Sequence, residues 1–196
     1  MKSPATIAVI GAGLAGLSCA GKLQAAGHIV TVFEKSRAAS GRMSTKRGTS
    51  DQGDDWQCDT GTQYFTARSA AFRAEVQRWQ AAGIAAEWHP EIAVFGSFNL
   101  TPPKPEASPV TRYVGYPRMT SPARYLAETL TVSTGTTVQA LRRNNSQWQL
   151  CSAEQGWLNA CFDAVVLAVP APQAIPLLQP VHAGLADIAT SAPMRG

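Results

Sequence analysis

The chain opens with an alternation of strand and helix patterns. Residues 5–10 form a short, uncharged run rich in β-branched side chains, which predicts a strand buried on both faces. Leucines and small residues at helical spacing follow, and Gly27 is placed to end that helix. Residues 29–34 repeat the buried-strand pattern. A strand, a helix and a strand within 30 residues form a βαβ unit, so we expect a parallel strand pair with a right-handed crossover.

The middle of the chain has a weaker pattern. Residues 35–57 are polar, which favours a loop or a short helix within a loop. Residues 69–82 are amphipathic and begin with a serine that can cap a helix, whereas 91–100 favour a strand. Six of the thirteen prolines lie between 102 and 122, which predicts a connector before a helix over 121–130.

The period changes to two in the last third of the chain. Residues 136–142, 147–152 and 157–162 alternate between apolar and polar positions with turn residues between them, which predicts a small antiparallel meander. Residues 163–169 form another buried strand, and a helix is expected to follow through Leu178.

A glycine motif lies where the first strand meets the first helix, in the order Gly11-Ala12-Gly13-Leu14-Ala15-Gly16. Gly11 permits a tight turn, Gly13 lets the backbone approach a pyrophosphate, and Gly16 lets the helix pack close to the strand. The helix N-terminus offers free N–H groups and a partial positive charge to the same pyrophosphate. The motif therefore predicts a dinucleotide site, with a ligand-free glycine turn as the alternative.

Glu34 ends the second strand 23 residues after Gly11, where a carboxylate can accept hydrogen bonds from ribose hydroxyls. An acid at this position disfavours the 2′-phosphate of NADP. NAD and FAD both remain, since each presents an adenosine ribose and a pyrophosphate.

Composition narrows the function classes. The 196 residues are 45% hydrophobic, enough for one domain and part of a second. A net charge of +4, scattered along the chain, does not indicate a nucleic-acid partner. Four cysteines without a C-x-x-C spacing, and three distant histidines, favour reduced thiols in a cytoplasmic protein and no metal site. Glycines interrupt the first apolar stretch and prolines interrupt 164–178, so neither a signal peptide nor a membrane partner is expected.

A basic segment follows the ribose acid and includes Lys35-Ser36-Arg37 and Ser40-Gly41-Arg42-Met43. The planar fork of Arg42 suits phosphate oxygens, although a solvated loop is the simpler alternative. The segment resembles the R-x-G-G-R signature of the amine-oxidase-like FAD flavoproteins, with Ser40 where that family has glycine.

Further motifs resemble the bacterial renalase-like members of that superfamily. The run from Asp59 to Arg68 is similar to their D-x-G-A-Q-Y-F-T-x-R, with Thr62 in place of alanine. Residues 114–120 resemble G-x-P-x-M-S, and 165–173 resemble their second cofactor-side strand with its A-x-P-A-P-Q ending. The resemblance extends from about residue 5 to residue 178.

The resemblance implies an α/β fold in which a Rossmann-like FAD/NAD(P)-binding domain contains a parallel sheet and a small β-meander, and an α+β substrate domain begins as an insertion. It implies non-covalent FAD. Tyr64 would lie in the substrate pocket beside the flavin, with packing in the core as the alternative role. Val138 would contact the adenine through its backbone, and the alternative is that it is an ordinary strand residue. The implied cofactor-binding residues are Gly11, Ala12, Gly13, Ala15, Gly16, Glu34, Lys35, Ser36, Gly41, Arg42, Met43, Gly61, Thr62, Gln63, Tyr64 and Val138.

The implied reaction is hydride transfer from a mis-reduced NAD(P)H isomer to flavin, with dioxygen as the final acceptor and hydrogen peroxide as product. Such a donor requires no general base. A secondary amine is the alternative small-molecule substrate, and a truncated, non-catalytic nucleotide-binding module or an NAD-linked dehydrogenase is the alternative function. The electron donor, the oligomeric state and the activity of the chain ending at Gly196 stay open.

The resemblance also predicts a discontinuous domain organisation. Residues 1–83 and 131–180 are expected to bind FAD, 84–130 to start the substrate domain, and 181–196 to begin a truncated return to it. Because the family's closing segment beside the flavin is missing, we expect the chain to be a fragment, a truncated gene product or the ordered portion of a longer protein.

Overall fold

The computed structural model describes residues 3–90 and 110–192, so the strand predicted over 91–100 lies outside the described residues. The chain divides into two compact units, one made of residues 1–43 and 123–196 and the other of residues 44–122. The functional division between FAD-binding and substrate-binding segments stays a prediction.

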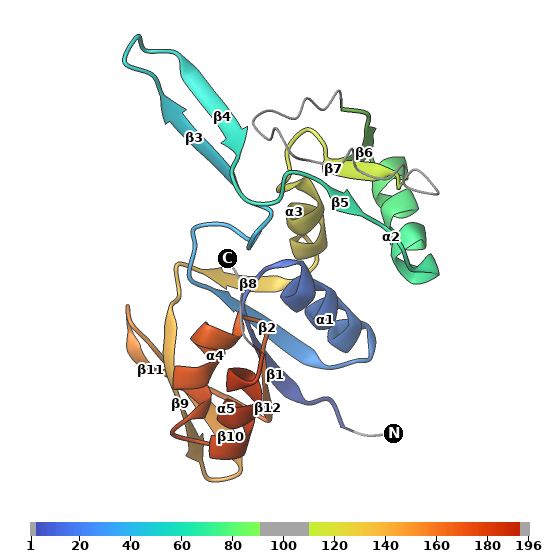
Figure 1. Ribbon diagram of the computed structural model, residues 1–196. Helices are drawn as coiled ribbons and strands as arrows, with labels where there is room; N and C mark the ends of the chain where they lie inside the picture. The colour runs from blue at the N-terminus through green and yellow to red at the C-terminus, as the bar shows by residue number, and fades with distance from the viewer. Residues whose placement is uncertain (1–2, 91–109, 193–196) are drawn as a thin grey trace, which may run out of the picture. The chain divides into compact units, whose positions relative to one another are not determined.

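The first unit is built on a parallel sheet with the strand order β12-β1-β2-β8 (Figure 1). Its strands are β1 (Thr6–Ile10), β2 (Ile29–Glu34), β8 (Thr131–Thr134) and β12 (Ala164–Leu167). Val9 in β1 pairs with Val32 on one side and Val166 on the other. Helix α1 (Leu14–Ala25) connects β1 to β2, which confirms the predicted βαβ unit and the α/β fold class.

Alternation along β1 gives the sheet two hydrophobic faces, as the period of two in a strand requires. Ile7 and Val9 face a cluster that includes Leu17 of α1 and Ala123 of α3 (Ser121–Ala127). Ala8 and Ile10 face a second cluster, with Phe33, Leu141, Leu150, Phe162 and Leu177. The sheet is therefore covered on both sides, which explains why its strands are uncharged runs.

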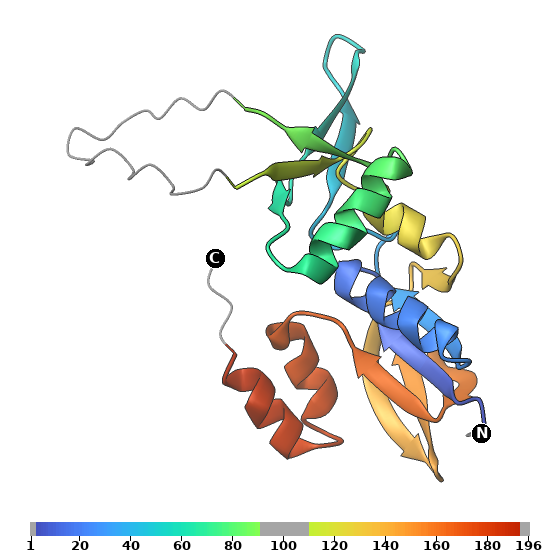
Figure 2. The ribbon, with the colours of Figure 1, turned by 90° about the vertical axis from the view of Figure 1, so that its right-hand side faces the viewer.

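The second face of the sheet is covered by the predicted meander, whose strands lie in the order β11-β10-β9. These strands are β9 (Val138–Asn144), β10 (Gln147–Ser152) and β11 (Gly156–Phe162). Asn145 takes a left-handed conformation with φ 55° in the first turn. Helices α4 (Ala171–Leu178) and α5 (Ala183–Thr190) follow β12 and pack side by side (Figure 2).

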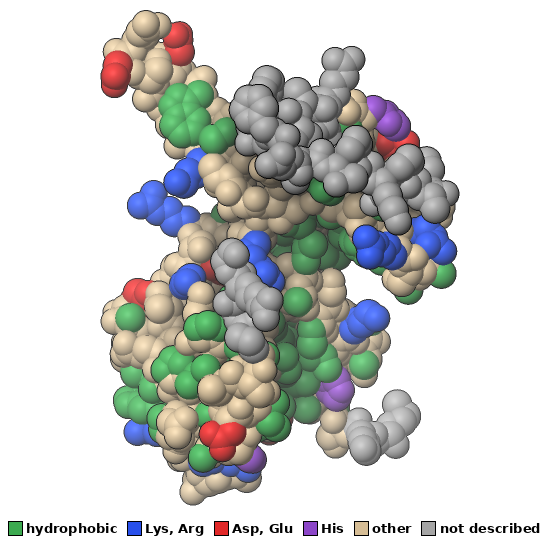
Figure 3. Space-filling view, viewed as in Figure 1, with side chains coloured by type: hydrophobic (Ala, Val, Ile, Leu, Met, Phe, Trp, Pro, Cys, Tyr) green, Lys and Arg blue, Asp and Glu red, His purple; other side chains and the backbone are tan. Residues whose placement is uncertain are grey.

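The second unit contains a three-stranded antiparallel sheet of order β5-β7-β6 and a separate hairpin. The sheet consists of β5 (Phe65–Thr66), β6 (Ala85–Trp88) and β7 (Arg112–Gly115), and the hairpin of β3 (Thr45–Thr49) and β4 (Asp55–Asp59). Figure 3 shows acidic side chains at the tip of the hairpin and basic side chains nearer its base. Every residue of β4 is exposed.

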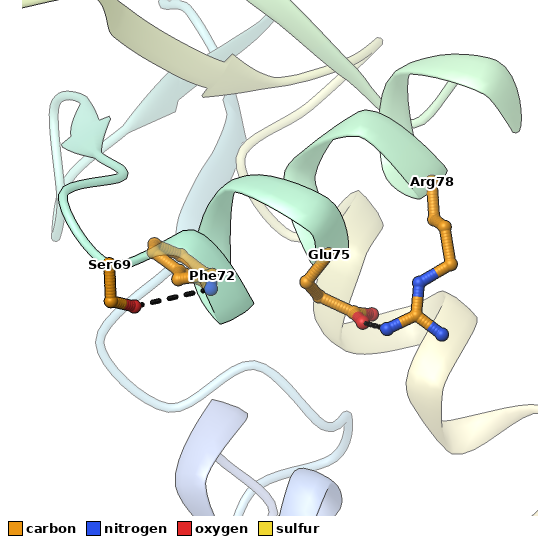
Figure 4. Close-up of polar contacts among 4 residues, drawn as sticks. All are labelled: Ser69, Phe72, Glu75 and Arg78. Atoms are coloured by element: carbon orange, nitrogen blue, oxygen red, sulfur yellow. Dashed lines mark hydrogen bonds and ion pairs between the residues drawn. The ribbon is translucent and has the colours of Figure 1, made fainter.

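Helix α2 (Ala70–Ala81) confirms the predicted helix and its cap. The Ser69 hydroxyl accepts a hydrogen bond from the Phe72 N–H at 3.2 Å, and Glu75 pairs with Arg78 one turn apart (Figure 4). The buried ring of Trp79 meets Phe72 edge-on at 5.8 Å. The helix is thus fixed at its start by a cap and along its length by aromatic packing.

Two sequence predictions differ from the structure. Residues 45–59 form a hairpin, where a loop or a short helix within a loop was predicted over 35–57. The sequence did not indicate the hairpin because its mostly exposed strands carry no hydrophobic alternation. The helix predicted over 121–130 ends at Ala127. In addition, helix α5 and strands β5, β6, β7 and β8 had not been predicted.

No helix in the described part of the chain is long and apolar enough to span a membrane.

Candidate nucleotide-binding site

The glycine bend lies at the carboxyl end of β1, between the ends of two neighbouring strands. The Gly11 N–H donates to the Phe33 carbonyl at 2.8 Å, and Gly11 has φ +105°, a region that favours glycine. A Cβ at Gly11 would lie 2.7 Å from the Ala168 carbonyl oxygen, beyond β12. The bend is therefore closed in on both sides, at the edge where open α/β sheets bind ligands.

Gly16 allows helix α1 to approach the bend. A Cβ at Gly16 would lie 1.9 Å from the Gly11 carbonyl oxygen, a distance that no real pair of atoms could occupy. The helix therefore sits directly against the backbone of the bend, and its N-terminus stays at the end of β1.

The N-terminus of α1 has the features of an anion site. Gly13 is the N-cap residue in an extended conformation, without a side-chain cap, and the first turn contains no acid. Backbone N–H groups in the first turn of a helix have no acceptor within the helix, and the helix dipole adds positive potential there. A diphosphate fits this position by charge and by hydrogen bonding.

The Glu34 carboxylate holds the bend to the end of β2. One carboxylate oxygen, Oε2, accepts the Ala12 N–H at 2.8 Å, and Oε1 accepts the Ser36 N–H at 2.9 Å. The residue is only 6% exposed. A carboxylate has about four lone-pair sites, so each oxygen keeps one for a further donor such as a ribose hydroxyl.

Residues that the sequence had not indicated complete this end of the sheet. The Thr136 N–H donates to the Glu34 carbonyl at 2.9 Å, and the Gly135 N–H donates to the Ser36 carbonyl at 3.0 Å. These bonds tie the segment after β8 to the predicted ribose acid. No residue type marks such backbone partners. The glycine at position 135, which has φ +64° in the structure, is a sequence signal for a turn here.

The segment over 35–43 lies against the bend. Gly41 has φ +58°, and a Cβ there would approach the Gly13 Cα to 2.9 Å. Met43 is buried, whereas Lys35 and Arg42 are exposed. The structure therefore brings the predicted phosphate-binding segment next to the predicted pyrophosphate turn.

Six further predicted residues also belong to the described ranges. Val138 begins β9, and its side chain packs against the second core cluster. Ala15 is exposed on the first turn of α1. Gly61, Thr62, Gln63 and Tyr64 lie in the second unit. Their cofactor roles stay predictions.

Tyr64 is 38% exposed and takes part in an aromatic contact within the second unit. Its ring lies 5.6 Å from that of Trp88, and the Arg112 guanidinium stands 5.2 Å from the Tyr64 ring centroid. The ring is therefore packed against two neighbours and still partly exposed. No group of three potential metal ligands gathers anywhere in residues 3–90 or 110–192.

Comparison with known proteins agrees with this geometry. Residues 9–78 match the family model of the NAD(P)-binding Rossmann-like domain. A stretch of 77 residues is 35% identical to an L-amino-acid oxidase of Gloydius halys, and covers 39% of this chain and 15% of that enzyme. The sequence match and the βαβ unit thus both give the first part of the chain a Rossmann-like dinucleotide-binding fold, which is similar in sequence to that of L-amino-acid oxidases.

Other proteins are similar to this chain in a short stretch of sequence or in fold. A stretch of 38 residues is 58% identical to a 4,4'-diapophytoene desaturase of Staphylococcus haemolyticus, covering 19% of this chain and 8% of the desaturase. Among solved structures, a candidate protoporphyrinogen oxidase from Exiguobacterium sp. 255-15 has a TM-score of 0.64 at 13% identity, over 95% of this chain and 64% of that one. Wild-type putrescine oxidase bound to putrescine has a TM-score of 0.58 at 14% identity, over 89% and 60% of the two chains. The chain thus spans less than two thirds of these relatives.

Proposed function

We propose that the chain binds FAD and forms the cofactor-binding part of a flavin-dependent oxidase of renalase type. Its electron donor in this proposal is a dihydronicotinamide, a mis-reduced isomer of NADH or NADPH. The observation that carries the proposal is the uncapped N-terminus of α1, bordered by the glycine bend and by the Glu34 carboxylate. The motifs after Glu34 favour FAD over NAD, because a second phosphate-binding segment follows the ribose acid.

The residues of the first unit fit the adenosine diphosphate half of FAD. The N–H groups at Gly13 and in the following turn would bind the diphosphate, and the remaining lone pairs of Glu34 would accept the ribose hydroxyls. Arg42, exposed beside Gly41, would supply the positive charge that a diphosphate requires.

When bound, FAD would supply hydride acceptance and electron transfer to dioxygen, which yields hydrogen peroxide. A dihydronicotinamide donor transfers hydride without first losing a proton, so this chain's own residues need only bind and orient it. Tyr64, whose ring contacts Trp88 and Arg112, is our candidate for that positioning.

The decisive experiment compares two valine substitutions in the same segment. A Cβ at Gly13 would stand 3.7 Å from the Gly41 Cα, so the two further methyl groups of Gly13→Val would occupy the approach to the bend. Gly21, also in α1, has no other atom within 4 Å of an added Cβ, so Gly21→Val is the matched control. We expect FAD titration to give binding in the control and none in Gly13→Val; stoichiometric flavin in Gly13→Val would refute the assignment.

A flavin amine oxidase is the second candidate, favoured by the likeness to L-amino-acid oxidase and putrescine oxidase. Anaerobic mixing of the FAD-loaded chain with a mis-reduced dihydronicotinamide, putrescine or an L-amino acid separates the two. Bleaching of the flavin band by the first donor alone supports renalase-type chemistry, and bleaching by an amine supports the alternative.

A non-catalytic nucleotide-binding module is the third candidate. A colourless protein stabilised by ADP but not by FAD would favour it. An NAD-linked dehydrogenase would instead bind NADH with no effect of Arg42→Ala.

A further inference from the structure

A cavity of about 140 Å³ lies at the base of the β3–β4 hairpin, entirely within residues 44–122. It is lined by residues from the two hairpin strands and from the segment after β7: Thr45, Gln57, Cys58, Asp59, Pro117 and Arg118. Its volume is sufficient for a phosphate group or for the carboxylate end of a small molecule. The lining is polar, and its only cationic side chain is Arg118.

The guanidinium of Arg118 lacks partners in the part of the chain that the structure describes. Its Nε atom is buried and makes no hydrogen bond, and the side chain forms no ion pair with described residues. A buried donor without an acceptor destabilises the fold, so such a group requires a physical explanation. The backbone around it is fixed, since the Ser121 hydroxyl accepts from the Arg118 N–H and the Arg118 carbonyl accepts from the Ser121 N–H at 2.9 Å.

The nearby carboxylate does not neutralise this arginine. Asp59 accepts a hydrogen bond from the Thr45 hydroxyl across the hairpin, and no ion pair joins it to Arg118 within the described residues. An arginine fork with unused N–H donors matches the oxygens of a carboxylate or phosphate. We propose that this cavity is an oxyanion-binding site, in which Arg118 binds the phosphate or carboxylate group of a small molecule.

This inference goes beyond the proposed FAD site, because it uses none of the residues assigned to the cofactor. The cavity also carries its own reporter, since Cys58 is exposed and lines it. Iodoacetate and iodoacetamide both alkylate a thiolate by displacing iodide, but only iodoacetate carries a carboxylate. The ratio of their rates at Cys58, resolved from the other three cysteines by peptide mass spectrometry, measures attraction of the anion by the cavity.

The test compares this ratio in the full chain and in three variants. A unit charge within a few ångströms changes the local concentration of an anion, so Arg118→Met should lower the ratio about two- to fivefold. Arg118→Lys should retain most of it, because the charge remains. Arg78→Met removes an arginine of the same unit that is 74% exposed, and should leave the ratio unchanged. An unchanged ratio in Arg118→Met with wild-type circular dichroism would overturn the proposal.

A second arm uses the unmodified protein and identifies the ligand class. Inorganic phosphate or acetate, compared with chloride at equal ionic strength, should slow iodoacetate at Cys58. Protection by phosphate indicates a phosphate-bearing ligand, protection by acetate indicates a carboxylate, and protection by neither overturns the proposal even if Arg118→Met fails to fold. FAD content measured in the same preparations keeps this outcome separate from the fate of the proposed function.

Discussion

Replacing Glu34 by glutamine tests whether its carboxylate holds the glycine bend together in the ligand-free protein. In the structure the two carboxylate oxygens each accept one backbone N–H, from Ala12 at 2.8 Å and from Ser36 at 2.9 Å. A glutamine has one carbonyl oxygen and one NH₂ group, so it can accept only one of these bonds at its former atom. The other backbone N–H then faces a second donor in a region that is 94% shielded, since Glu34 is 6% exposed.

The expected loss of unfolding free energy follows from that single bond. A hydrogen bond to a charged group contributes about 1.5–3 kcal/mol, and a buried donor left without an acceptor costs a similar amount. We therefore expect Glu34→Gln to lower the free energy of unfolding by about 2–3 kcal/mol. For a chain of this size such a change lowers the melting temperature on the order of 5–10 °C.

Chemical denaturation of the ligand-free protein measures this loss, with Glu128→Gln, an exposed acid whose side chain makes no hydrogen bond in the described residues, as the matched control. Amide hydrogen exchange adds a local measurement, because the Ala12 and Ser36 amides should exchange faster in Glu34→Gln than in the control. Equal stability and equal exchange in the two variants would refute the structural role. If Glu34→Gln weakened FAD binding without lowering stability, the role of Glu34 would be limited to a contact with the ribose.

Three further substitutions test other parts of the fold. Gly16→Ala should prevent native folding of the first unit and abolish dinucleotide binding, because its Cβ would lie 1.9 Å from the Gly11 carbonyl oxygen. Gly21→Ala in the same helix should instead stabilise the protein by about 0.5–1 kcal/mol, and thermal melts compare the two variants. Hydrogen bonds from Gln147 and Thr6 lower the pKa of Asp163 below its ordinary 3.8, so its contribution is complete above pH 3.8 and is lost as the pH falls through the folded-state pKa. Asp163→Asn should therefore reduce stability at pH 6 and lose less between pH 6 and pH 3 than the wild type, as denaturation at both values would show. Ser69→Ala should destabilise α2 by about 1 kcal/mol through loss of its cap, and an unchanged denaturation midpoint would contradict this.

Much of the first unit could be predicted because its elements have simple one-dimensional signals. Strands buried on both faces, such as Thr6–Ile10 and Ala164–Leu167, are uncharged runs, and the meander strands alternate. In the second unit the cap at Ser69 could be predicted too, because a serine hydroxyl can accept an N–H of the first helical turn. These signals depend on neighbours close in sequence, so no tertiary information is needed to recognise them.

The second unit was harder to predict because its strands depend on partners far apart in sequence. Strand β7 pairs with both β5 and β6, although each is only two to four residues long. The β3–β4 hairpin is exposed on both strands, so the hydrophobic pattern had nothing to indicate. Arg118 could not be distinguished from an ordinary surface arginine without the cavity that the hairpin forms around it.

The sequence predicted that Glu34 binds the ribose of a ligand. In the structure its carboxylate already accepts two backbone hydrogen bonds from the protein itself. The two uses are compatible, because a carboxylate that already holds Ala12 and Ser36 has lone pairs left for a sugar. Holding the bend before the ligand arrives also reduces the ordering that binding would otherwise require, so more of the contact energy appears as affinity. By this argument Glu34→Gln weakens dinucleotide binding for two reasons. One contact with the ligand is lost, and part of the binding free energy is used to order the bend. Its effect on affinity should therefore exceed that of removing an acceptor of equal strength from a site that is already rigid.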